Sequence, residues 1–204
     1  MSAPGIAVTT RNAITTSHRT LLLNHHKYFP PNNMANEYPR EDALKMCYRR
    51  LIRLKPLISQ RDMVRMTYVQ YLRYKFITED YSKKVSTSSI SLSGLETDVV
   101  RQVENSLYFC LKAVSEVKKR VLGEEAVSQE SRIARNILKN ILTIEFEKAT
   151  LIAKDPQQNF PILRKSFNYL SPSASKSPAL LRFNSLREFD RCLIGLNETL
   201  GTRL

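Results

Sequence analysis

A row of cations near residue 50 forms the clearest chemical pattern in this chain. Lys45, Arg49 and Arg53 recur at steps of four, so they share one face of a helix. Arg50 lies beside this row, and Tyr48 adds a ring that carries a hydroxyl. Such a face attracts anions, and arginine guanidinium groups pair well with carboxylates and phosphates. The pattern therefore predicts a docking surface for an acidic partner.

Basic and aromatic side chains further along extend this candidate surface. Tyrosine rings can stack on unpaired bases while cations hold the phosphates, an arrangement that suits single-stranded RNA or DNA. The alternative is that the rings lie partly inside a helical bundle with only their hydroxyls in water. The tyrosines in question are Tyr68, Tyr71, Tyr74 and Tyr81. The predicted partner-binding residues are Lys45, Tyr48, Arg49, Arg50, Arg53, Arg65, Arg73 and Lys75, and the predicted core motif is Leu51 with Phe76.

Patterns typical of catalysis or metal binding are absent from the sequence. It contains neither a G-x-S-x-G motif nor a phosphate-binding P-loop. Cys47, Cys110 and Cys192 stand far apart without a C-x-x-C pair, which argues against zinc and iron–sulfur sites. All three histidines fall within the first 38 residues, away from the expected folded body. We therefore expect a protein that is not an enzyme and that binds no metal or cofactor.

The overall charge also favours an anionic partner. The 204 residues carry a net charge of +13, and residues 41–84 alone hold eleven cations and five acids. This balance suits a nucleic acid, an acidic protein or an anionic lipid surface, although a basic protein without a specific polyanion site has the same composition. No apolar run is long enough to span a bilayer, so no transmembrane segment is expected.

Composition divides the chain into a tail and one domain. Residues 1–36 contain no Asp or Glu but do contain basic and hydroxyl side chains, which is typical of a mitochondrial transit segment or a disordered basic tail. We expect residues 1–38 to form this segment and residues 39–204 to form a single helical domain. Stretches rich in Ser, Thr or Pro predict linkers near 82–97 and 155–184.

Apolar residues at steps of three and four predict an all-α helical bundle. The expected helices cover about 40–55, 98–121 and 131–153, with two more that begin near residues 59 and 185. Ser59 and Ser185 each open a pattern that matches a capping box. The helix near 98–121 has the most regular stripe. The expected stripe of the second helix is Met63, Met66, Val69, Leu72 and Phe76.

The segment around Tyr48 and Arg49 resembles the start of the mitochondrial LYR-motif family, whose signature is Leu-Tyr-Arg on a first helix. Cys47 takes the place of the leucine, and Phe76 stands where the family has a phenylalanine near the end of its second helix. The resemblance covers about residues 41–120. It implies an LYR-like three-helix core, here with additional C-terminal helices. It also implies that basic helix residues bind the acidic mitochondrial acyl carrier protein, whose acyl chain lodges among the helices.

Longer segments resemble the fungal family called increased recombination centers protein nineteen. They include residues 48–56, 71–76, 137–140 and the terminal string 196–204. The family is implied to act in sporulation and in maintenance of mitochondrial DNA, and so in genome integrity, without an assigned chemical activity. We therefore expect a non-enzymatic mitochondrial factor that acts through its basic helical surface. The alternatives are an LYR-type adaptor that binds acyl carrier protein for respiratory or ribosome assembly, and a mitochondrial RNA- or DNA-binding protein.

Overall fold

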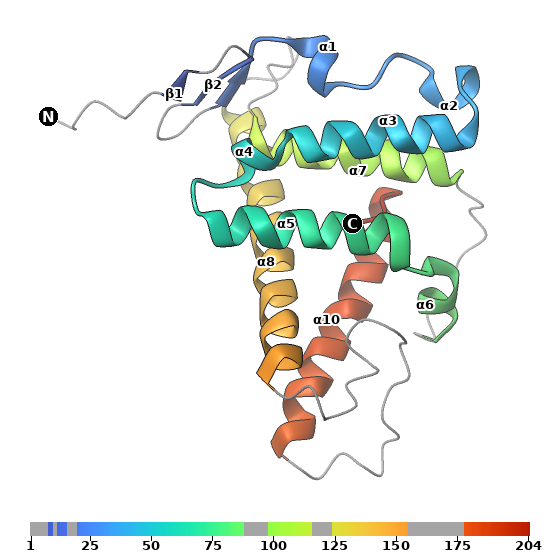
Figure 1. The fold of residues 1–204 in the computed structure, drawn as a ribbon, viewed down its shortest axis with the longest axis vertical. Helices are drawn as coiled ribbons and strands as arrows, with labels where there is room; N and C mark the ends of the chain where they lie inside the picture. Colours follow the sequence, from blue (N-terminus) through green and yellow to red (C-terminus); the bar gives the residue numbers. More distant parts are fainter. Residues whose placement is uncertain (1–7, 10–11, 16–19, 88–97, 116–123, 155–177) are drawn as a thin grey trace, which may run out of the picture.

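Helices dominate the computed structural model of this chain, which describes residues 8–9, 12–15, 20–87, 98–115, 124–154 and 178–204 (Figure 1). The predicted helical bundle is thereby confirmed. A small three-stranded antiparallel sheet precedes the bundle. This sheet was not predicted from the sequence. Its strands, in the order β1-β2-β3, are β1 (Val8–Thr9), β2 (Ala13–Thr15) and β3 (Thr20–Leu22). The register pairs Ile14 with Leu21.

Two short helices connect this sheet to the bundle. They are α1 (His25–Tyr28) and α2 (Met34–Glu37), and both lie against α3 (Arg40–Arg53) (Figure 1). Tyr28 and Met34 are buried in the main core cluster. The residues between α1 and α3 are therefore part of the folded body, although they belong to the span predicted as a tail or transit segment.

The predicted first helix is confirmed as α3. Pro39 precedes it, and Glu41 and Asp42 lie in its first turn, where the helix dipole stabilises carboxylates. The helix ends at Arg53, and Pro56 occupies the first turn of the short helix α4 (Lys55–Ile58). Along the apolar side of α3 and α4, Cys47, Leu51 and Leu54 are buried, while Leu44 and Ile58 are half-buried.

The second predicted helix consists of α5 (Asp62–Arg73) and a π-helical turn, η1 (Tyr74–Thr78). Its predicted apolar stripe is confirmed at Leu72, which is buried, but is wrong at Met63 and Met66, which are exposed, and it omits the buried Tyr68 and Tyr71. Its predicted capping box is wrong. The helix begins after Arg61 without a side-chain cap, and the Ser59 hydroxyl instead accepts a hydrogen bond from the Arg61 amide.

The third predicted helix is α7 (Val99–Val114), and it follows α6 (Tyr81–Thr87). Its N-cap is Asp98, whose Oδ1 accepts a hydrogen bond from the Val100 amide at 3.0 Å. The predicted stripe is confirmed up to Val114, since all its members there are buried: Val100, Val103, Leu107, Cys110 and Val114. Residues 116–123, which include the predicted end of this helix, lie outside the described residues.

The two C-terminal helices are longer than predicted. They are α8 (Glu124–Lys154) and α10 (Pro178–Leu200). Because α10 begins at Pro178, the predicted capping box at Ser185 is wrong. Residues 178–184 of the predicted second linker are helical, as are residues 82–87 of the first. The rest of both linkers lies outside the described residues.

Four helices form the centre of the bundle. Helix α3 packs on α7 and α5, and the long α8 crosses α7 and α5 before it runs beside α10 (Figure 1). Apolar residues from α3, α5, α7 and α8 share one core cluster, which also takes in Leu193 of α10 and Leu204. A three-helix core of the LYR type stays a prediction, since α8 is part of the same core.

Candidate interaction surface

Three of the four predicted cations on α3 are exposed, namely Lys45, Arg49 and Arg53, and the first two make no hydrogen bond or ion pair with another described segment of the chain. Lys45 Nζ lies 3.6 Å from Glu41 and 3.7 Å from Asp42, and all three side chains face solvent. Exposed ion pairs at such distances are worth roughly 0–1 kcal/mol, so a partner can displace them at little cost. Arg49, one turn further on, is exposed and has no hydrogen-bond or ion-pair partner among the described residues. These two side chains form an accessible basic face.

Arg50 and Arg53 bind the N-terminal segment of the same chain. Arg50 donates from Nε to the Phe29 carbonyl at 2.9 Å and from Nη1 to the Met46 carbonyl at 3.2 Å. Arg53 donates to the Lys27 carbonyl at 3.1 Å. Burial, and then the charge of Arg53, lower the pKa of Arg50. Both predicted partner-binding residues therefore hold α1 against α3, and their replacement would disturb the fold as well as the surface.

The predicted core motif lies directly behind this face. Leu51 is buried, and its carbonyl accepts a hydrogen bond from the Tyr68 hydroxyl at 2.9 Å. Tyr48 packs edge-on against Phe76, with 5.1 Å between ring centroids. Leu51 and Phe76 also line a cavity of about 180 Å³ among α3, α5, α7 and α8. The structure thus joins the first and second predicted helices through these residues.

The cations predicted from the second helix have three different environments. Arg65 pairs with Asp62 at 2.6 Å, and Arg73 is exposed without a partner among the described residues. Lys75 is inside the protein, with only 6% of its side chain exposed, 2.5 Å from Glu79. Burial outweighs the attraction of Glu79 and lowers the pKa of Lys75 to about 8. Lys75 is consequently not on the accessible surface.

The tyrosines that were candidates for base stacking are mostly internal. Tyr68, Tyr71 and Tyr81 are all buried, and Tyr74 is half-buried. The Tyr81 hydroxyl donates to Glu198 at 3.0 Å. The second interpretation offered by the sequence, rings inside the bundle, is the one that the structure shows.

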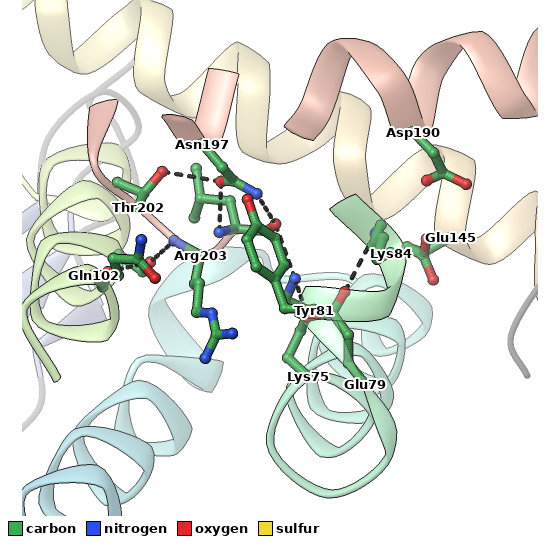
Figure 2. Close-up of polar contacts among 12 residues, drawn as sticks. Lys75, Glu79, Tyr81, Lys84, Gln102, Glu145, Asp190, Asn197, Thr202 and Arg203 are labelled. Atoms are coloured by element: carbon green, nitrogen blue, oxygen red, sulfur yellow. Dashed lines mark hydrogen bonds and ion pairs between the residues drawn. The ribbon is translucent and has the colours of Figure 1, made fainter. Parts of the chain in front are cut away.

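A buried polar network centred on Asn197 was missed by sequence reasoning (Figure 2). The Asn197 Nδ2 donates to the Leu204 main-chain oxygen at 2.8 Å, and its Oδ1 accepts from the Leu204 amide at 2.8 Å and from the Thr202 hydroxyl at 3.0 Å. Lys75 Nζ donates to the same Leu204 oxygen at 3.0 Å. Gly201 reverses the chain with a φ of +59°, a conformation that disfavours other residues.

A second buried cluster joins α8 to α10. Lys148 Nζ lies 2.8 Å from both Glu145 and Asp190, and the three side chains are almost fully buried. Burial disfavours the charged form of Lys148, but Asp190 and Glu145 together hold the pKa of Lys148 above its ordinary value.

A third cluster is centred on Glu79, which pairs with Lys75 and also with Lys84 at 3.2 Å (Figure 2). These ion clusters hold helices together, and Lys75 and Glu79 also line the cavity among α3, α5, α7 and α8.

The described residues offer no metal centre, and two of the three cysteines are buried. No group of three or more His, Cys, Asp or Glu side chains is placed to hold a metal within the described ranges. Cys47 and Cys110 are buried, and burial raises the pKa of each thiol to about 12, so neither is a nucleophile at neutral pH. Across the described part of the chain, no helix combines the length and apolar character needed to cross a membrane.

Comparison with known proteins identifies the family. A family model described as Increased recombination centres protein 19 matches residues 8–204. The chain belongs to this family. A relative of that name from Vanderwaltozyma polyspora is 38% identical over 207 residues, covering 100% of this chain and 99% of the relative. Similar relatives occur in Eremothecium gossypii, at 37% identity with 100% and 92% coverage, and in Saccharomyces cerevisiae, at 33% identity with 100% coverage of both. No solved structure matches significantly.

Membership in the Increased recombination centres protein 19 family confirms the resemblance drawn from the terminal string. In the structure, that string supplies Asn197, Gly201 and the residues that the Asn197 side chain binds. The close spacing of Asn197, Thr202 and Leu204 is the sequence feature that could have signalled a buried hydrogen-bond network. The terminal string therefore stabilises the fold through buried hydrogen bonds between Asn197 and residues 202 and 204.

Proposed function

We propose that this member of the Increased recombination centres protein 19 family is a non-enzymatic mitochondrial factor that supports maintenance of mitochondrial DNA, and with it sporulation and genome integrity. It does so by docking an acidic protein on the exposed face of α3. The observation that carries the proposal is Arg49, which is solvent-exposed beside Lys45 and unpartnered among the described residues. An exposed cation without an ion pair has none to break when it binds a carboxylate of a partner protein, so binding costs it little free energy.

An acidic protein suits this face better than a single-stranded nucleic acid. The stacking platform that single strands require would come from the tyrosines near the cations. Tyr68, Tyr71 and Tyr81 are buried, and the ring of Tyr48 is packed on Phe76. The tyrosines interleaved with these cations therefore offer little ring surface for stacking, while Lys45 and Arg49 are accessible charges that suit a partner presenting carboxylates.

An LYR-type adaptor for acyl carrier protein is a second candidate, and one observation favours it. Tyr48 and Phe76, the two aromatic residues on which that resemblance depends, touch each other beside the cavity of about 180 Å³. This cavity has room for part of an acyl chain beside its apolar lining residues such as Leu44, Leu72 and Val103, although Lys75, Glu79 and Arg203 also line it. This candidate uses the same face of α3, so the two proposals differ in the identity of the acidic protein.

Affinity purification from mitochondria, with and without nuclease, tests the proposal. The test variant is Lys45→Glu with Arg49→Glu, because neither side chain binds another segment of the fold. The matched control is Arg101→Glu with Arg132→Glu, which makes the same change in net charge at exposed positions of α7 and α8. We expect an acidic protein to be recovered with the wild type and the control but not with the α3 variant.

The nuclease treatment separates the two kinds of partner. A complex that survives nuclease but is lost in the α3 variant supports protein docking. A complex that nuclease removes from all three proteins, with binding that falls steeply as salt increases, would show that nucleic acid is the partner and overturn the proposal.

A further inference from the structure

A second surface, separate from the basic face of α3, has the features of a binding groove. It lies between the N-terminal half of α5 and the middle of α8, and it has a volume of about 400 Å³. Val64, Val114 and Leu142 contribute to its apolar floor, and the end of α4 borders it. Residues of α4 and of the end of α7 complete the lining beside α5 and α8. No further element among the described residues fills the groove.

Large apolar side chains at the edge of the groove are unusually exposed. Met63 on α5 is 51% exposed and Phe146 on α8 is 38% exposed. Burying such side chains contributes about 25 cal/mol for each Å² of apolar surface removed from water. Methionine also adapts its shape to different partners because its side chain is unbranched and flexible. Both residues are therefore suited to be covered when another molecule binds.

The charges around the groove all have one sign. Three cations line it, namely Arg61, Arg135 and Lys139, and none of its lining residues is an Asp or Glu. Arg135 is fixed in place, since its Nε donates to the Ala113 carbonyl at 3.0 Å. Arg61 and Lys139 extend into solvent. An apolar floor with a basic rim complements an apolar stripe flanked by carboxylates.

The shape of the groove selects a helix as the occupant. Its α8 wall runs from Arg135 to Phe146, which corresponds to about 16 Å or three helical turns. Walls made of two helices offer no free sheet edge to which a strand could pair, whereas an amphipathic helix inserts its apolar stripe between them. A bilayer surface is flat and cannot enter a groove. A second copy of this chain, at net +13, would be repelled by the basic rim.

We propose that the groove between α5 and α8 binds an amphipathic helix of a partner protein, with its apolar stripe on Met63 and Phe146 and its Asp or Glu residues on Arg61, Arg135 and Lys139. The site is distinct from the α3 face, and none of its residues takes part in the proposed docking of the acidic protein there. A result that rules out binding at one of these two sites therefore does not rule out binding at the other.

A labelled peptide tests the chemistry of the groove. The probe is a fluorescent helical peptide of about fourteen residues, with Leu at i, i+3, i+4 and i+7 and Glu at the remaining positions, and binding is followed by anisotropy. The same peptide with Lys in place of Glu is the comparison. The chain offers a matched pair of test positions, because Met63 and Met66 lie on the same helix and are 51% and 52% exposed, but only Met63 lines the groove.

We expect Met63→Glu and Lys139→Glu each to weaken binding of the Glu peptide by about tenfold or more, which is about 1.4 kcal/mol. Met66→Glu and Arg101→Glu should change it less than threefold, and the Lys peptide should bind at least about tenfold more weakly than the Glu peptide. Equal effects of Met63→Glu and Met66→Glu, or equal binding of the two peptides, would overturn the proposal.

A photo-crosslinking amino acid at position 63, with position 66 as control, then tests the occupant in cells. A crosslink from position 63 alone to an acidic helical segment of another protein supports the assignment. A crosslink to lipid, to a second copy or to another segment of this chain would show that a different occupant covers the groove, and the proposal would be wrong.

Discussion

Asn197→Ala should strongly destabilise the fold, because it removes the centre of a buried hydrogen-bond network. The Asn197 side chain is 1% exposed and makes three hydrogen bonds to the last residues of the chain. Alanine would leave the Leu204 amide and the Thr202 hydroxyl without their acceptor in a buried region. The Leu204 oxygen would keep only its bond from Lys75.

The expected cost follows from these partners. An unsatisfied buried donor costs about 1–3 kcal/mol, and the Thr202 hydroxyl can rotate to reduce its share. We therefore expect Asn197→Ala to lower the free energy of unfolding by about 2–4 kcal/mol. The chain offers a control of the same residue type. Asn105 donates a single, exposed hydrogen bond to the Gly201 carbonyl at 2.9 Å, so Asn105→Ala should cost less than about 1 kcal/mol.

Urea denaturation followed by circular dichroism measures both values, and hydrogen exchange of the Leu204 amide reports the local effect. That amide should exchange much faster in Asn197→Ala than in the wild type. A loss below about 1 kcal/mol, or one equal to that of Asn105→Ala, would refute the reasoning that the terminal string holds the fold together through this side chain.

Three further predictions concern buried charges and thiols. Lys148→Met should lower the free energy of unfolding by about 3–5 kcal/mol at pH 7, because it leaves two buried carboxylates unpaired, and the loss should shrink at pH 4, where urea denaturation can be repeated. Since the pKa of Lys75 is lowered to about 8 from 10.5, the unfolded chain binds more protons than the folded one between these values. Wild-type stability should therefore rise between pH 8 and 10 relative to that of Lys75→Met, and an unchanged difference between the two urea curves would contradict the assigned burial. Native labelling with iodoacetamide at pH 8 should modify Cys192 alone, as mass spectrometry would show, whereas labelling in urea should modify all three cysteines.

Periodicity predicted the parts of the fold in which one face of a helix is purely apolar. The stripe of α7 from Val100 to Val114 is buried, and α3 covers Arg40–Arg53, close to the predicted span of about 40–55. Apolar periodicity did not predict that Tyr68 and Tyr71 of α5 are buried while Met63 and Met66 are exposed. The Tyr68 hydroxyl donates to the Leu51 carbonyl on another helix, while the Tyr71 hydroxyl is buried without a hydrogen-bond partner among the described residues. No pattern within α5 contains that information.

The candidate surface was only partly predictable for a related reason. Steps of four placed Lys45 and Arg49 correctly on one exposed face of α3. The sequence could not show that Arg50 and Arg53 bind carbonyls more than twenty residues earlier, or that Lys75 meets the Leu204 oxygen 129 residues later. A cation seen in sequence looks the same whether its partner is solvent, its own chain or another molecule. Only the three-dimensional arrangement separates them.

The most direct test of the central proposal measures mitochondrial DNA in cells. The chromosomal copy is replaced by Lys45→Glu/Arg49→Glu or by the charge-matched control Arg101→Glu/Arg132→Glu, and both proteins are checked for equal abundance. The copy number of mitochondrial DNA is then followed by quantitative PCR during growth on a fermentable carbon source. We predict that the α3 variant loses mitochondrial DNA, while the control retains it. Retention in the α3 variant equal to that in the control would contradict the account.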